Sequence, residues 1–171
     1  MTWTWVWRVT TGVALLSIPL LMIAVRLNIS AGWIFAFVFV YGAPLWLGSV
    51  AVVIWIALGL FTPGSAVETA GPRTRGLLYG LLWLYLVALS FFCLFMSDGG
   101  DADDWQSPAG HFLGVDGYNS RTPEYLWRAE AAAFPSLAVS WVALVAAAII
   151  YGVVVVRRRR ARARSVSAPV R

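Results

Sequence analysis

The stretch that decides the fold is GLLYGLLWLYLVALSFFCLFM, residues 76–96, in which no side chain is charged and no histidine occurs. As an α-helix rising about 1.5 Å per residue it would be roughly 31 Å long, close to the hydrocarbon core of a bilayer at about 30 Å. The strands of a transmembrane β-barrel are about ten residues long and alternate apolar with polar positions, which this stretch does not do. It therefore predicts a transmembrane helix.

Three more segments lack Asp, Glu, Lys, Arg and His, namely residues 9–25, 33–61 and 135–156. Together the four segments predict an all-α integral membrane protein in which residues 1–156 form a single four-helix transmembrane domain. We expect the segment at 9–25 to be retained as a first span, because it is longer than the core of a usual signal peptide and has no convincing cleavage site after it. The segment at 33–61 is too long for one upright crossing, so Pro44 is expected to kink it or to separate a turn from the spanning part.

The distribution of arginine predicts the orientation of the four spans. The chain has no lysine, and the side of the membrane that would hold both termini and residues 62–75 carries ten of the thirteen arginines. Positively charged residues are concentrated on the cytoplasmic side of membrane proteins. We therefore expect a plasma-membrane protein with cytoplasmic termini and an extracytoplasmic loop at residues 97–134.

The remaining composition suggests the kind of genome that encodes the chain and excludes several kinds of site. The absence of lysine, together with the abundance of Ala, Val, Gly and Trp, suggests a bacterial genome of high GC content. Cys93 is the single cysteine, which excludes an intrachain disulfide and a multi-cysteine metal site. The arginines are not interleaved with stacking aromatic residues, so we do not expect nucleic acid to be a partner.

The acidic start of the outer loop is the one place where the sequence suggests a metal. Asp101, Asp103 and Asp104 lie close together, and the only histidine, His111, follows them. An EF-hand that began at Asp101 would need a liganding oxygen five positions into the loop and a glutamate at its end, where this chain has Trp105 and Phe112. We therefore predict no metal or other cofactor, and retain the three aspartates and His111 as weak metal candidates.

The second half of the outer loop predicts a short amphipathic helix. Thr122 is a suitable N-cap and Pro123 a suitable first helical residue, and Glu124 and Arg128 have the spacing of an i,i+4 ion pair. Apolar residues recur at Leu126 and at positions 129, 133 and 134, which gives a narrow apolar stripe. We expect this helix to lie on the outer membrane surface.

Two sets of residues are candidates for contacts with lipid headgroups and between helices. The tail at residues 157–171 is expected to be disordered, and its basic side chains next to a span predict contact with anionic lipid headgroups. The lipid-contact candidates are Arg157, Arg158, Arg159, Arg160, Arg162 and Arg164. Small residues at i,i+4 spacing predict close helix packing, either within the bundle or between copies. The packing candidates are Gly76, Gly80, Ala143 and Ala147.

No motif in the sequence predicts a reaction. The four apolar segments contain no charged residue of the kind that proton and ion pathways use, and no hydrolase, metalloprotease or phosphate-binding motif is present. We expect a non-enzymatic membrane component, whose partners are the lipid bilayer and another membrane protein or a further copy of the chain. The alternatives are a small transporter or channel subunit that acts as an oligomer, and a membrane enzyme or metal-binding protein that uses the acidic outer loop.

Overall fold

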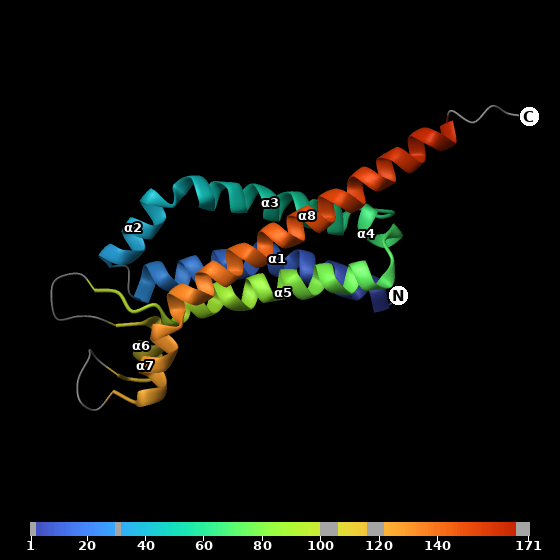
Figure 1. The fold of residues 1–171 in the computed structure, drawn as a ribbon. Coiled ribbons are helices and arrows are strands. Elements are labelled where there is room, and N and C mark those ends of the chain that lie inside the picture. Colours follow the sequence, from blue (N-terminus) through green and yellow to red (C-terminus); the bar gives the residue numbers. More distant parts are fainter. Residues whose placement is uncertain (1–2, 30–31, 100–105, 116–121, 167–171) are drawn as a thin grey trace, which may run out of the picture.

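The computed structural model describes residues 3–29, 32–99, 106–115 and 122–166, and the described residues are helical apart from turns and one isolated bridge between Asp98 and Gln106 (Figure 1). The long helices are α1 (Trp3–Ile29), α3 (Ala43–Phe61), α5 (Pro72–Phe95) and α8 (Ala133–Val166). The short helices are α2 (Trp33–Tyr41), α4 (Ala66–Thr69), α6 (Pro108–Phe112) and α7 (Glu124–Ala131).

Four of the helices are long and apolar enough to cross a membrane, as the sequence predicted. The candidate spans are Trp5–Ile29, Ala43–Phe61, Pro72–Phe95 and Ala133–Arg164, so each overlaps one of the predicted segments. Helix α5 packs against α1 and α8, while α1 packs against α3. The start of α1, the end of α8 and α4 lie at one end of the molecule, here called the terminal end, and α6 and α7 lie at the opposite end, here called the loop end (Figure 1).

The apolar segment at 33–61 is two helices rather than one. Helix α2 ends at Tyr41 and α3 begins at Ala43, with Gly42 between them. Pro44 occupies the first turn of α3, where its missing N–H has no intrahelical acceptor to lose. The interruption predicted at Pro44 is thereby confirmed, and it turns α2 away from the axis of α3 (Figure 1).

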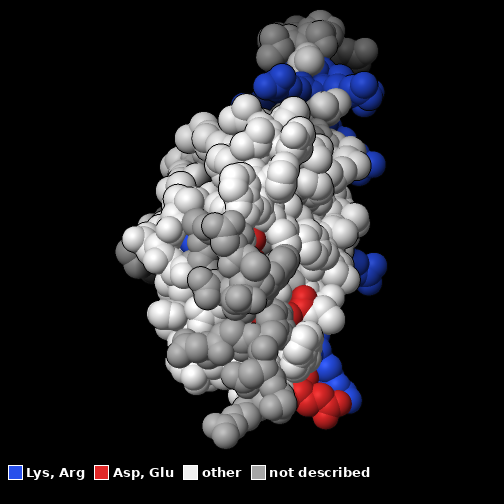
Figure 2. All heavy atoms as spheres, turned by 90° about the vertical axis from the view of Figure 1, so that its left-hand side faces the viewer, with Lys and Arg blue, Asp and Glu red and all other residues white. Residues whose placement is uncertain are grey.

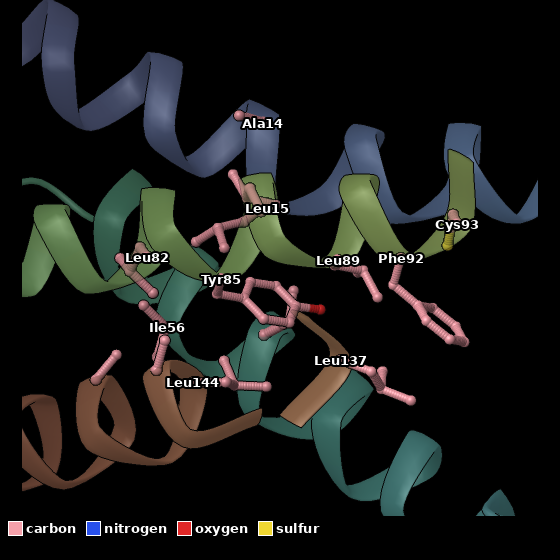
Figure 3. Close-up of a cluster of buried hydrophobic side chains, with 14 of the residues drawn as sticks. Ala14, Leu15, Ile56, Leu82, Tyr85, Leu89, Phe92, Cys93, Leu137 and Leu144 are labelled. Atoms are coloured by element: carbon pink, nitrogen blue, oxygen red, sulfur yellow. The ribbon is translucent and has the colours of Figure 1, made fainter. Parts of the chain in front are cut away.

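The core lies where α5 meets the other long helices. Leu82 and Leu86 of α5, Leu15 of α1 and Ile56 of α3 are all almost completely inaccessible. Figure 3 shows Tyr85 of α5 projecting among these side chains and those of α8. Because lipid surrounds a membrane protein with apolar groups, this core stabilises the fold through close packing more than through removal of apolar surface from water.

The small residues predicted to pack differ between the two helices that carry them. Ala143 and Ala147 of α8 are buried in the core. Gly76 and Gly80 of α5 are exposed, and a Cβ atom added at either one would meet nothing within 4 Å. No other described side chain therefore packs closely on these two glycines, and a contact between copies of the chain stays a prediction.

The start of the tail is helical, which corrects the expectation of disorder for residues 157–166. Helix α8 continues without a break from Ala133 to Val166 and projects beyond the rest of the terminal end (Figure 1). Arg157–Arg160 simply extend the helix that the span has already begun, and arginine is a good helix former. Residues 167–171 lie outside the described part of the chain.

Helix α7 occupies most of the region in which the sequence predicted a short helix. It begins at Glu124 with Pro123 at the N-cap, one residue later than expected, so Thr122 is not the N-cap. The predicted Glu124–Arg128 pair is confirmed at 2.6 Å, between two side chains that are about 80% exposed. Of the apolar stripe, Leu126 of α7 and Ala133 of α8 are buried, while Phe134 of α8 is half exposed.

Candidate functional site

Of the four predicted metal candidates, the structure describes only His111. Asp101, Asp103 and Asp104 lie outside the described residues. His111 is exposed on α6, where its ring contacts that of Phe112. Within the described ranges, no three His, Cys, Asp or Glu side chains lie close enough to hold a metal ion.

The fold brings together two buried charges, those of Arg26 and Asp98. Arg26 is in the last turn of α1, Asp98 follows the end of α5, and both side chains are fully buried. Arg26 Nη2 lies 3.2 Å from Asp98 Oδ2, and Nη1 of the same guanidinium donates to the carbonyl of Met96. Arg26 also lies over the ring of Phe35, with 5.7 Å between its Cζ and the ring centroid. Helix α1 therefore joins α2 and the end of α5 at the loop end.

Asp98 has a second task, because its carboxylate caps α2. Oδ1 accepts from the N–H of Ile34 at 2.9 Å, and Oδ2 accepts from the N–H groups of Phe35 and Gly32 at 2.7 and 3.2 Å. These are the N–H groups that a helix N-terminus leaves without intrahelical acceptors, and the helix dipole favours a negative charge there. Gly32 is required at this point, since a Cβ atom on it would collide with the Asp98 carboxylate.

Reading the sequence alone missed this pair. Arg26 is one residue beyond the apolar segment at 9–25, and Asp98 is two residues beyond the segment at 76–96. Both were therefore assigned to the outer aqueous side, as part of the charge asymmetry. The available signal was that two opposite charges stand at the same end of two spans, a position at which neighbouring helices could pair them.

A second ion pair fastens the terminal end. Arg8 of α1 is only 4% exposed and pairs with Glu68 of α4. Glu68 also accepts a hydrogen bond from the N–H of Gly64, which lies in the left-handed region at φ 63° and closes the turn after α3. The first helix is thus held by one ion pair near each of its ends.

The outer loop is attached to the bundle through its own polar contacts. Ser107 caps α6 by accepting from the N–H of Gly110 at 3.1 Å, and its hydroxyl donates to Glu130 of α7 at 2.7 Å. Gln106 Nε2 donates to the carbonyl of Val115 at 3.0 Å, and the side chain of Leu126 on α7 is buried. Helices α6 and α7 contact the ends of α1, α5 and α8. The described part of the loop is therefore a packed cap on the loop end.

This cap presents apolar side chains outward. Phe112 and Leu113 at the end of α6 are 64% and 54% exposed, and Tyr125 and Trp127 of α7 are 62% and 48% exposed. Charged atoms are sparse in the described part of the surface that faces the viewer in Figure 2, and the basic residues lie at its rim, at the upper edge and along the right-hand side. Exposed apolar side chains on ordered elements are typical of contacts with a partner or with the membrane surface.

Two of the hollows in the described part of the chain bear on function. One, of about 200 Å³, lies between α1, α2, α3 and α5 and is lined almost entirely by apolar side chains, with Tyr85, Ser49 and Cys93 as its polar groups. The other, of about 990 Å³, is an open groove at the terminal end between the start of α5 and the final part of α8. Four arginines and several apolar side chains line this groove, which is here called the basic groove.

Comparison with protein-family models, with curated proteins and with solved structures found no match.

Proposed function

We propose that this chain is a four-helix plasma-membrane protein that acts as a non-enzymatic component or accessory partner of another membrane protein, which it contacts through the cap at its loop end. Its termini would be cytoplasmic and its cap extracytoplasmic. The orientation is supported by ten arginines at the terminal end and in the tail against three on the other side.

The observation that carries this proposal is the construction of the cap. Ser107, Glu130 and the buried Leu126 hold α6 and α7 against the bundle, while Phe112 and Tyr125 remain exposed on them. Because the elements are already ordered, binding through these side chains would not require the loss of much backbone freedom. Large aromatic side chains on such a support are the residues that most often anchor protein interfaces.

The buried charges support a structural role over a catalytic one. The Asp98 carboxylate accepts from backbone N–H groups through both of its oxygens and also faces Arg26, so its hydrogen-bonding capacity is used by the fold. A general base or a metal ligand needs an accessible lone pair. The alternative of a transporter or channel subunit is weakened by the apolar lining of the 200 Å³ cavity, which provides few groups that could replace the water around an ion.

Site-specific photocrosslinking in the membranes of the cell that makes this protein tests the proposal. A photoreactive phenylalanine analogue would replace Phe112 in one variant and Tyr125 in another. Val87, which is 62% exposed near the middle of α5, provides the matched control at a lipid-facing position. We expect discrete protein adducts at positions 112 and 125 and lipid adducts at position 87.

The partner would then be identified by mass spectrometry and its adduct sought with the roles reversed. Lipid adducts alone at all three positions would contradict a protein partner at the cap. They would place Phe112 and Tyr125 in the headgroup region instead. Adducts to a second copy of this chain would identify the partner as the protein itself.

A further inference from the structure

The basic groove has an apolar part and a basic part, which follow one another along α5 and α8. Leu77 of α5 and Ile149 and Val153 of α8 line its deeper part, and they are 57%, 62% and 43% exposed. Arg157 follows Val153 by one helical turn, about 6 Å further along α8. Arg73 stands one turn before Leu77 on α5. The apolar and basic residues are therefore arranged in order along the direction of the spans.

The charge of the groove has one sign. Its lining includes Arg73, Arg157, Arg158 and Arg162 and contains no acidic side chain. Glu68, the acidic residue nearest in the chain, does not line it and is engaged by Arg8 and the N–H of Gly64. The groove thus concentrates positive charge at one level of the molecule, where an anion would be attracted.

The start of α5 adds donors at the same level. Its N-cap, Gly71, has no side chain to cap the helix, Pro72 follows in the first turn, and no acidic residue stands there. The N–H groups of a first turn lack intrahelical acceptors and form a site for anions together with the helix dipole. Gly71, Arg73 and Thr74 all line the groove, so these donors and the arginine side chains border the same space.

We propose that the basic groove is a specific site for one anionic glycerophospholipid. Its phosphate would lie between Arg73 and Arg157 near the start of α5, and an acyl chain would lie along Leu77, Ile149 and Val153. A phospholipid carries its phosphate above its acyl chains, which is the order of the basic and apolar walls in the groove. A free phosphate would leave the apolar walls unused.

The proposal differs from a diffuse attraction between the tail and a charged membrane. Only one face of the basic part of α8 borders the groove, namely the face of Arg157, Arg158 and Arg162. Arg159 and Arg160 are on the same two turns but do not line it. A diffuse contact would use both faces about equally, whereas a bound lipid depends on one of them.

Native mass spectrometry of the purified full chain in detergent tests this distinction. The protein would be titrated with phosphatidylglycerol, with phosphatidylcholine of the same acyl chains, and with glycerol phosphate. The test variant is Arg73→Gln with Arg157→Gln, and the control is Arg159→Gln with Arg160→Gln. All four of these arginines are exposed and each double variant removes two positive charges from the same end, so folding and net charge are matched.

We expect one phosphatidylglycerol to bind per chain, with phosphatidylcholine and glycerol phosphate each binding at least about tenfold more weakly. The test variant should lose about tenfold or more in affinity for phosphatidylglycerol, and the control less than about threefold. Equal losses in the two double variants would overturn the proposal in favour of diffuse attraction. Equal binding of the two lipids would show an apolar groove without headgroup recognition, and equal binding of glycerol phosphate would show an anion site without a lipid.

Discussion

Asp98 satisfies three needs of the fold, two with its side chain and one with its backbone. It neutralises Arg26, it caps α2, and its backbone exchanges hydrogen bonds with Gln106 at the start of the cap. A buried charge is costly unless it is paired and fully hydrogen-bonded, and both conditions hold for this carboxylate. The two members of the ion pair are not equivalent, however, because Asp98 has backbone donors on α2 that do not depend on Arg26.

This difference predicts that substituting Asp98 lowers the free energy of unfolding more than substituting Arg26 does. Asp98→Asn leaves the Arg26 guanidinium buried without its counterion and should lower the free energy of unfolding by about 3 kcal/mol or more. Arg26→Met leaves Asp98 on the α2 N-terminus and should cost about 1 kcal/mol less than Asp98→Asn. The measurement is reversible unfolding of each variant in the same detergent or bicelle.

The double variant Arg26→Met with Asp98→Asn provides the control for this comparison. It removes both charges, so it should be more stable than Asp98→Asn alone. If the two single variants lost the same stability, the capping of α2 by Asp98 would make no measurable contribution.

Ser107 links α6 to α7 through the hydrogen bond from its hydroxyl to Glu130. Ser107→Ala removes the α6 cap and the hydrogen bond to Glu130, and should destabilise the cap by about 1 kcal/mol. Hydrogen–deuterium exchange should then be faster in residues 108–131 and unchanged in α5. Exchange that rose equally in the cap and in α5 would show that the cap does not open separately from the bundle.

At the scale of elements, α5 is the helix whose environment the sequence predicted least well. Its length and apolar character identify it as a span, but the GxxxG at Gly76 and Gly80 suggested a packing face and these glycines are instead exposed. Close packing on a glycine occurs elsewhere, at Gly59 of α3, where the Tyr151 hydroxyl of α8 fills the space that a Cβ would need. Periodicity finds small residues but does not reveal which neighbour approaches them.

The contrast between these glycines can be measured. Gly59→Ala should destabilise the monomer by about 1–3 kcal/mol, because Tyr151 or the backbone of α3 must move. Gly80→Ala adds a methyl group in open space and should leave monomer stability unchanged or raise it by up to about 1 kcal/mol through helix propensity. Unfolding in detergent at low protein concentration tests both.

A loss of self-association in Gly80→Ala, with unchanged monomer stability, would show that the exposed GxxxG binds a second copy. Unchanged association would leave this face in contact with lipid alone.

At the scale of the whole molecule, the four spans were predictable because each is a long run without charge. The break at Gly42 could be anticipated from Pro44, since proline disfavours a helix interior. The shared end of two spans made a pairing of Arg26 with Asp98 possible, but the sequence did not show that α1 packs beside α5, which brings these residues together across 72 positions of the chain. The sequence predicted that the tail arginines contact lipid, but it did not predict that the start of α5 lies beside them in the basic groove.

The proposed orientation of the molecule predicts which exposed positions a membrane-impermeant reagent can reach. In a background with Cys93→Ala, a cysteine at His111 should be labelled by an impermeant maleimide in intact cells. A cysteine at Pro63, in the turn after α3, should be labelled only after the membrane is opened. The reverse pattern would show that the arginine count does not determine the orientation of this protein.

The bonds that Asp98 makes also constrain the order in which the protein can mature. The N–H groups of Gly32 and Phe35 receive their acceptor from a residue made 66 and 63 positions later. A nascent chain that has inserted α1, α2 and α3 therefore lacks the carboxylate that caps α2 and neutralises Arg26. It gains this carboxylate only after α5, the third long helix, has left the ribosome and crossed the bilayer. Chains that end before residue 98 should therefore be less stable in the membrane than chains that include this carboxylate, which a truncation series would measure.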